Sequence, residues 1–495
     1  MRRQDEPVAT TRPIGRRQFL KLSALGAPMV GRASQAFQQR PVDLPVVVVG
    51  AGLAGLRAAG ILRDAGQRVV VLESRAFPGG RVQTIRMPFS EGLYAEAGPI
   101  RIPGAHKTVL KLAADHGLAL VPFASTTGAS VISVRGVTAR VPDDLRKAAS
   151  TLDLKPDEAG LGSSSLLQRY VRDLPADLDT TMPTTELYSG WETHDRLTWP
   201  EWLRARGASA GAVTLMTLGG DSKELSALYV LRQVALLKNT DQFFKIQGGM
   251  DQLPRAMAKA LKDTIRYNSA VVRIDQSRDS VQIGYLANGR PASITASRAI
   301  LAVPFSTLRR IDVRPTLSAA KKNAIDSLPY FPATRFLLES KTRFWDDAGL
   351  TGTARTDQPA EVWDCTYDLP ATAGILGATV GGAMGTSMSN MERSRALNAG
   401  VRAVSSIFPD LTANFVKGSV YRWALDPWSR GAFAVFRPGQ MSALMPEIPR
   451  PEGRLHFAGE HTSVWMGWME GALESGGRAA REVLGKPAVS SGAGS

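Results

Sequence analysis

The sequence predicts an α/β fold in which a parallel sheet carries helices on its faces and is joined to an α+β region with a helical part. The 495 residues are too many for one hydrophobic core, so at least two folding regions are expected. Residues 45–72 contain a buried strand, a helical stretch and a second buried strand, the unit from which parallel sheets are built. Residues 142–235 have a largely helical pattern that prolines interrupt.

Charge and cysteine content narrow the classes of function. The chain carries 60 Lys and Arg against 45 Asp and Glu, a formal net charge of +15. Because the basic residues are scattered rather than gathered in one stripe, we expect no nucleic-acid partner. Cys365 is the only cysteine, and the five histidines have no metal-ligand spacing. Neither an internal disulfide nor a metal site is therefore expected.

Residues 1–36 are similar to a twin-arginine export signal. The paired arginines of Arg16-Arg17-Gln18-Phe19-Leu20-Lys21 precede a short apolar run, and the small residues at 33–36 offer a cleavage site. Such a signal implies the twin-arginine translocase as a partner and a periplasmic or secreted protein, with a basic tail as the alternative. Later apolar runs are shorter than the roughly 18 uncharged residues of a spanning helix, so we expect no stable membrane insertion.

The turn after the first strand is a dinucleotide-binding fingerprint. Gly50-Ala51-Gly52-Leu53-Ala54-Gly55 runs into the helical stretch 56–65 and then the strand 68–72. The three glycines permit a tight turn, close approach of a pyrophosphate, and close packing of helix on strand. Glu73 ends the second strand, where it can accept hydrogen bonds from an adenosine ribose. The sequence thus predicts a Rossmann-like domain whose cofactor contacts are Gly50, Gly52, Leu53, Ala54, Gly55 and Glu73.

A second glycine segment distinguishes FAD from NAD. Glu73 is followed, after five residues, by Gly79-Gly80-Arg81, and this pattern resembles the flavin amine oxidase family. The resemblance implies FAD as the cofactor and a glutathione-reductase-type domain, with Arg75, Gly80 and Arg81 along the cofactor. It disfavours an NAD-dependent enzyme.

Residues 95–103, Ala-Glu-Ala-Gly-Pro-Ile-Arg-Ile-Pro, resemble a segment of L-amino acid oxidases, the bacterial ones in particular. The resemblance places Gly98, Pro99 and Ile100 beside the flavin ring, with Arg101 reaching both the ring and the substrate carboxylate. A guanidinium suits this role because it makes two parallel charge-assisted hydrogen bonds to a carboxylate. Monoamine and polyamine oxidases have no carboxylate to hold.

Lys341-Thr342-Arg343-Phe344-Trp345 resembles the family segment whose lysine holds a water at flavin N5. Family members place that lysine two or four residues before the tryptophan. Both Lys341 and Arg343 fit this spacing, and alternation along a strand would point both to one face. We expect Lys341 to be the catalytic residue, with Arg343 as the alternative.

The most specific match lies near the C-terminus, in residues 455–462 and 467–472. In the family, Glu460 contacts the ribityl and pyrophosphate part, and a helix beginning near Trp468 points its N-terminus at flavin N1. Phe433 and Trp468 take the walls of the aromatic cage around the amine. The other contacts that the resemblance implies are Val271, Trp423, Gly459, Trp468 and Met469 for the cofactor and Gly467 for the substrate. Because Arg430 and Gly431 stand where relatives with covalent FAD have a cysteine, we expect non-covalent FAD.

The resemblance also implies a domain organisation. The FAD-binding domain is expected to be assembled from residues 43–100, 245–312 and 415–487. The substrate-binding domain, with its helical part, is expected to comprise residues 101–244 and 313–414. Residues 488–495 form a flexible tail.

The expected reaction is the FAD-dependent oxidation of an L-amino acid by dioxygen to a 2-oxo acid, ammonia and hydrogen peroxide. Asp364, with Glu361 and Asp368, favours a basic side chain such as that of arginine or lysine, whereas Trp465 and Trp468 favour an aromatic one. The alternatives are an amino acid dehydrogenase, a decarboxylating monooxygenase, a polyamine or monoamine oxidase, and a secreted flavin-containing interaction protein without turnover. A homodimer is left open.

Overall fold

The computed structural model describes residues 44–123, 128–141, 151–174, 178, 191–219, 222–238, 240–357 and 361–486. The chain divides after Asp43, and one compact unit begins at Leu44. The export signal expected at 1–36 and the tail expected at 488–495 therefore lie outside the described residues. Among the residues described, no helix is both long and apolar enough to cross a bilayer.

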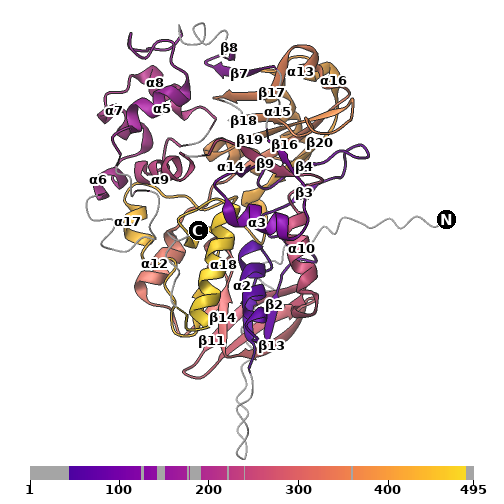
Figure 1. Ribbon diagram of the computed structural model, residues 1–495, viewed down its shortest axis with the longest axis vertical. Helices are drawn as coiled ribbons and strands as arrows, with labels where there is room; N and C mark the ends of the chain where they lie inside the picture. Colours follow the sequence, from indigo (N-terminus) through magenta and orange to yellow (C-terminus); the bar gives the residue numbers. More distant parts are fainter. Residues whose placement is uncertain are drawn as a thin grey trace, which may run out of the picture. The chain divides into compact units, whose positions relative to one another are not determined.

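A five-stranded parallel sheet forms the part that the first glycine turn predicted. Its strands, in spatial order, are β10 (Ile265–Arg266), β2 (Val69–Leu72), β1 (Val46–Val49), β14 (Arg298–Leu301) and β21 (Leu455–Phe457). The valine-rich β1 is completely buried, as a parallel strand covered on both faces should be. α2 (Leu53–Asp64) and α18 (Met469–Val483) pack together beside this sheet (Figure 1). The predicted Rossmann-like fold, built from separated stretches of the chain, is confirmed.

Smaller elements extend this part of the molecule. An antiparallel β11 (Ser269–Gln276), β12 (Val281–Ala287) and β13 (Arg290–Ala296) form a sheet to which β15 (Asp312–Arg314) adds in parallel. The helices and short strands nearby are α3 (Lys107–Asp115), α10 (Gln252–Ala260), η3 (Lys262–Thr264), α11 (Phe305–Leu308), β3 (Thr84–Ile85), β4 (Ala95–Glu96), β5 (Ile102–Pro103), β6 (Leu120–Pro122) and β9 (Phe243–Ile246).

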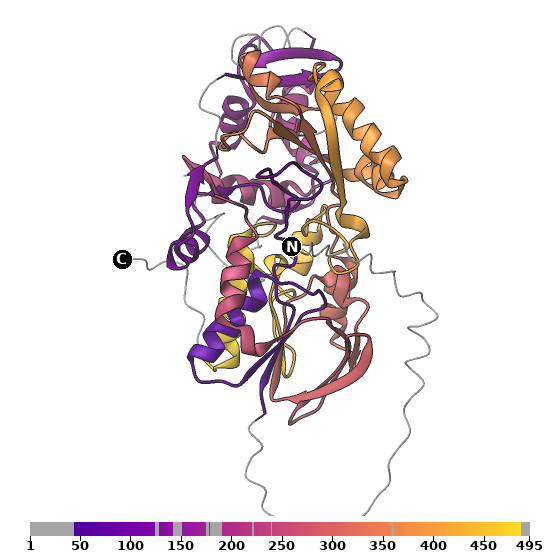
Figure 2. The ribbon, with the colours of Figure 1, turned by 90° about the vertical axis from the view of Figure 1, so that its right-hand side faces the viewer.

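A seven-stranded sheet forms the second, mixed region. Its order is β20 (Phe415–Arg422), β16 (Thr334–Ser340), β19 (Gly374–Val380), β18 (Glu361–Asp364), β17 (Leu350–Thr356), β7 (Ala129–Val134) and β8 (Val137–Val141). All neighbours are antiparallel except β17 and β7. Both views place this sheet and the β11–β13 sheet at opposite ends of the unit that begins at Leu44 (Figure 1 and Figure 2). Its helices are α13 (Phe344–Asp347), α14 (Gly382–Asn390), α15 (Arg393–Ser405) and α16 (Leu411–Asn414).

The predicted helical part of the substrate region is also confirmed. It contains α5 (Ser163–Val171), α6 (Glu192–Asp195), α7 (Trp199–Ala205), α8 (Ala210–Thr217) and α9 (Ala227–Leu237). α7 shows why one of these helices begins where it does. The Thr198 hydroxyl accepts from the Glu201 N–H while the Glu201 carboxylate accepts from the Thr198 N–H, so two N–H groups at the helix start are satisfied.

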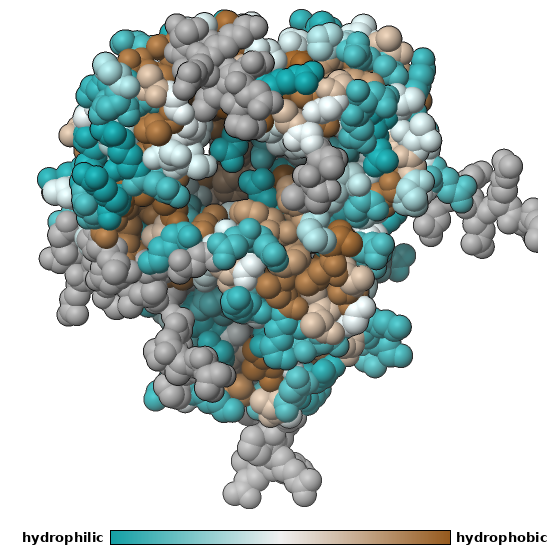
Figure 3. Space-filling view, turned by 45° about the horizontal axis from the view of Figure 1, so that its top comes forward, coloured by the Kyte–Doolittle hydropathy of each residue, from teal (hydrophilic) through white to brown (hydrophobic). Residues whose placement is uncertain are grey.

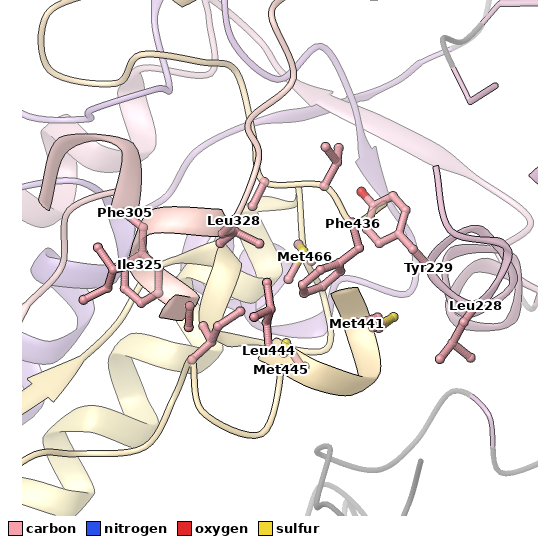
Figure 4. Close-up of a cluster of buried hydrophobic side chains, with 14 of the residues drawn as sticks. Leu228, Tyr229, Phe305, Ile325, Leu328, Phe436, Met441, Leu444, Met445 and Met466 are labelled. Atoms are coloured by element: carbon pink, nitrogen blue, oxygen red, sulfur yellow. The ribbon is translucent and has the colours of Figure 1, made fainter. Parts of the chain in front are cut away.

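One apolar core joins this helical part to the rest of the fold. Tyr229 of α9 meets Phe436 edge-on, with ring centroids 6.1 Å apart, and α12 (Ala319–Ser327) and α17 (Gln440–Leu444) supply Ile325, Met441 and Leu444 (Figure 4). The same core reaches the parallel sheet. α9 is therefore fixed relative to the sheet, which matters because it carries residues of the cavity described next.

Candidate active site

A cavity with a volume of about 510 Å³ lies among the described residues. The parallel sheet and α2 line one end, and β16, β18 and α9 line the other. A recess bordered by hydrophilic and hydrophobic side chains is visible on the surface (Figure 3). The cavity thus spans the regions from which cofactor and substrate contacts were expected.

The glycine turn shapes the first end of the cavity. A Cβ on Gly55 would lie 1.9 Å from the Gly50 carbonyl oxygen, so only glycine lets α2 pack this closely on the turn. Gly52 faces open space and caps α2 without a side-chain hydrogen bond, which leaves the N–H groups of the first turn free for phosphate. Gly50, Gly52, Leu53 and Ala54 line the cavity, whereas Gly55 does not. Gly55 thus has the packing role that the sequence predicted for it, and its expected contact with the cofactor stays a prediction.

Glu73 stands at the carboxyl end of β2, beside this turn. One oxygen of its carboxylate accepts from the Ala51 N–H at 2.7 Å, and the other accepts from the Arg75 N–H at 2.8 Å. Burial raises the pKa of Glu73 above its ordinary value. Arg75 pairs with Asp426 at 2.7 Å, and Val271 lines the same end. An acid at this place can accept hydrogen bonds from ribose hydroxyls, as the sequence predicted.

Glu460 connects the middle of the cavity to its far end. Its Oε1 accepts from Arg81 Nη1 at 2.7 Å and from the Ala434 N–H at 3.1 Å. Its Oε2 accepts from the Gly467 N–H at 2.8 Å. One carboxylate therefore holds together the Gly-Gly-Arg segment and the two C-terminal segments. Gly80, Gly459 and Met469 line the cavity beside this network.

The segment from Ala97 to Ile100 forms one wall. A Cβ on Gly98 would lie 2.2 Å from the Arg81 carbonyl oxygen, so this glycine permits a close approach of two backbones. The indole N–H of Trp423 donates to the Ala97 carbonyl at 2.9 Å. Gly98, Pro99, Ile100 and Trp423 all line the cavity, as expected.

Arg101 marks the substrate end of the cavity. Its Nη1 donates to Glu361 Oε1 at 3.1 Å, and its guanidinium lies 5.4 Å from the Phe243 ring centroid and 6.0 Å from that of Phe123. With about 30% of its side chain exposed, Arg101 stays accessible from the cavity. The arrangement gives a guanidinium held in place by one acid and two rings, with further N–H donors for a carboxylate.

Aromatic side chains form the rest of this end. The Phe433 ring is stacked on Phe331, with centroids 5.0 Å apart. A Cβ on Gly467 would lie 3.5 Å from the Phe433 ring, so a larger side chain there would narrow the space that Phe433 and Trp468 border. Trp468 caps α18 without a side-chain hydrogen bond, so free N–H groups face this end of the cavity.

Sequence reasoning missed Tyr229 and Gln233 of α9. Both line the cavity, and Gln233 Oε1 accepts from the Trp468 indole N–H at 2.7 Å. Burial raises the pKa of Tyr229, so its hydroxyl stays protonated across ordinary pH. The four-residue spacing places both side chains on one face of a helix, but nothing in the sequence says that this face meets the cavity.

The structure does not bring Lys341 or Arg343 to the cavity. Strand β16 ends at Ser340, so the alternation expected for a strand does not continue through these residues. Lys341 is exposed and donates to the Ala413 carbonyl at 3.1 Å, and Arg343 donates to the Thr366 carbonyl at 3.1 Å. The basic residue of this region that lines the cavity is Arg335, within β16.

Asp364 and Trp465 also lie outside the cavity lining. The Asp364 carboxylate accepts from the Trp345 indole N–H at 3.0 Å and from the Thr366 hydroxyl at 2.7 Å, and burial raises its pKa. Asp368 pairs with Lys245 at 2.5 Å. Trp465 packs edge-on against His106, with centroids 5.1 Å apart, and Trp468 packs edge-on against the same ring at 5.0 Å. Of the three acids named for a basic substrate, Glu361 alone lines the cavity.

Comparison with known proteins agrees with this geometry. Residues 53–484 match the model of the flavin containing amine oxidoreductases. The chain is 34% identical over 455 residues to YobN of Bacillus subtilis (strain 168), provisionally named an L-amino-acid oxidase, covering 88% of this chain and 94% of that protein. It is 32% identical over 461 residues to the L-amino-acid oxidase of Echis ocellatus, covering 88% of each.

Solved structures show the same fold at lower identity. Putrescine oxidase bound to putrescine has a TM-score of 0.76 at 23% identity, covering 90% of this chain and 99% of that one. Cyclohexylamine oxidase from Brevibacterium oxydans IH-35A has a TM-score of 0.75 at 23% identity, with coverage of 90% and 99%. The glycine turn, the free N–H groups of α2 and Glu73 fit FAD, the cofactor of this fold. The chain belongs to the flavin-containing amine oxidoreductase family and is an FAD-dependent oxidoreductase.

Proposed function

We propose that the enzyme oxidises an L-amino acid, with dioxygen as the electron acceptor, to a 2-oxo acid, ammonia and hydrogen peroxide. The observation that carries this proposal is Arg101, a guanidinium at the end of the cavity that Phe433 and Trp468 also line. An amine substrate gives such a residue nothing to bind, whereas an amino acid offers a carboxylate. The names of the Bacillus subtilis and Echis ocellatus relatives support the same substrate class.

Bound in this cavity, FAD would supply a two-electron acceptor for the Cα–H hydride, with dioxygen as the terminal acceptor. The side chains of this protein bind and orient. Arg101 holds the carboxylate, and Phe433 and Trp468 confine the amine so that the Cα–H bond has one orientation. The Tyr229 hydroxyl, whose pKa burial raises, stays protonated and can donate a hydrogen bond to the substrate. The substrate amine enters neutral, so no strong base is required of the protein.

Attachment of the cofactor is proposed to be non-covalent. Cys365 is buried, burial raises the pKa of its thiol, and it is absent from the described residues that line the cavity. Denaturation should therefore release the flavin into the supernatant, and flavin that stays with the precipitated protein would contradict this.

A preference for substrates with basic side chains depends on Glu361, because Asp364 and Asp368 do not line the cavity. Glu361 Oε1 accepts from Arg101, which leaves Oε2 for a substrate ammonium or guanidinium group. If Glu361 recognises such a group, Glu361→Gln should lower kcat/KM for L-arginine and L-lysine much more than for L-phenylalanine. Equal effects on all three would assign Glu361 to the positioning of Arg101 alone.

Other electron acceptors and other substrates would give different products and stoichiometries. One mole of dioxygen, peroxide and 2-oxo acid per mole of substrate indicates the oxidase that we propose. An amide product indicates the decarboxylating monooxygenase, and turnover with a quinone but not dioxygen indicates a dehydrogenase. Anaerobic bleaching of the flavin band by polyamines or monoamines, but not by L-amino acids, would overturn the proposal. A flavin that no amine bleaches would indicate a binding protein.

We also propose export by the twin-arginine route, which moves folded proteins and so suits one that binds FAD before crossing the membrane. Arg16→Lys together with Arg17→Lys should retain the protein in the cytoplasm of a host with this translocase. Unchanged export of the double variant would contradict the proposal.

A further inference from the structure

Four arginines line the cavity, and they differ in charge compensation. Arg75 pairs with Asp426 at 2.7 Å, Arg81 with Glu460 at 2.7 Å, and Arg101 with Glu361 at 3.1 Å. Arg335 has no carboxylate oxygen of the described residues within 4.0 Å of its guanidinium, the limit for an ion pair. It is thus the cavity arginine without a direct carboxylate partner among the described residues, and Glu361 and Glu96 favour its charge only from beyond that distance.

The contacts of Arg335 hold its side chain without neutralising it. Nη1 donates to the carbonyls of Glu96, Ala97 and Gly98, the second at 3.1 Å. Nε donates to Thr379 Oγ1 at 3.3 Å, and the guanidinium lies 5.0 Å from the centroid of the Trp363 ring. Carbonyl and hydroxyl oxygens orient the group but carry no net charge. Nη2 has no hydrogen-bond partner among the described residues and stays available to an occupant of the cavity.

Burial makes this arrangement unfavourable in an empty cavity. It lowers the pKa of Arg335 to about 10, which still leaves the guanidinium charged at neutral pH. A buried charge without a counter-ion is destabilising, and the penalty disappears when an anion is placed beside it. The Gly98 carbonyl accepts from Nη1 of Arg335, which holds the guanidinium beside the cavity wall formed by Ala97 to Ile100; Arg101 follows this segment directly.

We propose that Arg335 is a second anion-binding residue of the cavity, beside Arg101, and that its direct counter-charge is supplied by what the cavity holds. Two sources have this chemistry: the carboxylate of the substrate, and the negative charge that the flavin takes up on reduction. The proposal rests on FAD as the cofactor, and the possibility that the substrate carboxylate is the counter-ion also rests on the proposed function. Arg101, which pairs directly with Glu361 at 3.1 Å, remains the residue proposed to hold the substrate carboxylate, and Arg335 adds a second positive charge to the cavity.

The test changes the charge next to Arg335 at position 379, using two variants of nearly equal shape. Thr379→Asp places a carboxylate next to Nε and leaves the three carbonyl contacts of Arg335 in place, and Thr379→Asn is its neutral control. Arg335→Gln removes the charge itself. Arg343→Gln is a second control, because Arg343 also donates to backbone carbonyls but does not line the cavity.

Two readouts on the flavin-loaded protein need no turnover. The first is the dissociation constant of benzoate, a carboxylate without an amine, followed by the shift of the flavin spectrum. The second is the midpoint potential of the bound flavin. We expect T379D and R335Q to weaken benzoate binding at least tenfold, or to lower the equilibrium constant for two-electron reduction at least tenfold, which is about 30 mV. R343Q should leave both quantities within twofold of the wild type, and T379N is the neutral reference with which T379D is compared.

The two readouts separate the two sources. A change in benzoate affinity alone assigns the substrate carboxylate as the counter-ion, and a change in potential alone assigns the reduced flavin. If R335Q does not fold with flavin, T379D against T379N decides the question. Both quantities unchanged in T379D would overturn the proposal. Neither readout requires an L-amino acid to be turned over, so failure of the proposed reaction leaves this result interpretable.

Discussion

The cofactor end and the substrate end of the cavity are built in different ways. At the cofactor end, a turn of six residues and the acid that ends the next strand form one local group of contacts, so these neighbours in sequence are neighbours in space. At the substrate end, Arg101 comes from the segment before β5, and Gln233, Arg335 and Glu361 come from α9, β16 and β18. Part of the first end is therefore specified by local backbone geometry, whereas the second end depends on tertiary packing throughout.

This difference explains what the sequence could predict. The backbone requirements of Gly50 and Gly52 are local, so the parallel sheet and its cavity lining followed directly from a short motif. Lys341 and Arg343 were assigned on the assumption that a strand passes through them, but β16 ends one residue earlier. Arg335 could not be identified in advance, because only the pairing of β16 with β19 shows which face of the strand meets the cavity.

Gln233 shows the same limit on a helix. Its hydrogen bond to Trp468 joins residues 235 positions apart in sequence, and no local pattern encodes it. Asp364 is the opposite case. The sequence marked an acid near the pocket, and the structure buries it against Trp345 and Thr366.

The cofactor end should be the more sensitive to a single methyl group. Gly55→Ala would place a Cβ 1.9 Å from the Gly50 carbonyl oxygen, and because that atom is backbone, the turn itself must move. We expect at least a tenfold loss of flavin-loaded protein, measured by the ratio of flavin to protein absorbance after purification. Gly60→Ala, on the same helix but facing open space, is the matched control and should retain flavin. Normal flavin content in G55A would contradict the packing role.

Glu460 joins the two ends, so its loss should affect both. Glu460→Gln leaves Arg81 without its counter-charge in a largely buried site. Breaking a buried pair in this way destabilises a fold by about 3–5 kcal/mol. Thermal unfolding followed by flavin fluorescence should show a lower Tm and earlier flavin release. Glu452→Gln changes a half-buried acid that accepts from the Ser318 N–H and has no direct ion-pair partner among the described residues, so it should shift Tm far less.

At the substrate end, Arg101→Ala should act on binding. Loss of hydrogen bonds to a charged group is worth about 1.5–3 kcal/mol, or roughly a 10- to 150-fold increase in KM for L-amino acids. Flavin content should stay normal, since the Glu361 partner is partly exposed. Steady-state kinetics that show an unchanged KM would remove Arg101 from substrate binding.

Gln233→Leu should have a smaller effect, through Trp468. The indole N–H loses its 2.7 Å acceptor, so the ring is less well oriented, and an unpaired donor of this kind is worth about 1 kcal/mol. We expect kcat/KM to fall about fivefold, with Gln233→Glu, which keeps an acceptor oxygen, closer to the wild type. Equal losses in both variants would indicate general damage to α9.

Lys341→Ala should have the smallest effect. Its ammonium group is exposed and donates to a carbonyl on the surface. The rate at which the reduced enzyme reacts with dioxygen, measured by stopped flow, should stay within twofold of the wild type. A loss of tenfold or more would restore Lys341 to the catalytic position expected from the sequence.

Recognition of the substrate carboxylate is tested most directly by a pair of substrates that differ only in this group. L-Phenylalanine and phenethylamine, and likewise L-lysine and cadaverine, can be mixed anaerobically with the flavin-loaded enzyme while the flavin band is followed. The geometry around Arg101 predicts that at least one amino acid bleaches the flavin at least 100-fold faster than its amine. Bleaching by the amines at equal or greater rates would contradict amino acid oxidation and indicate an amine oxidase.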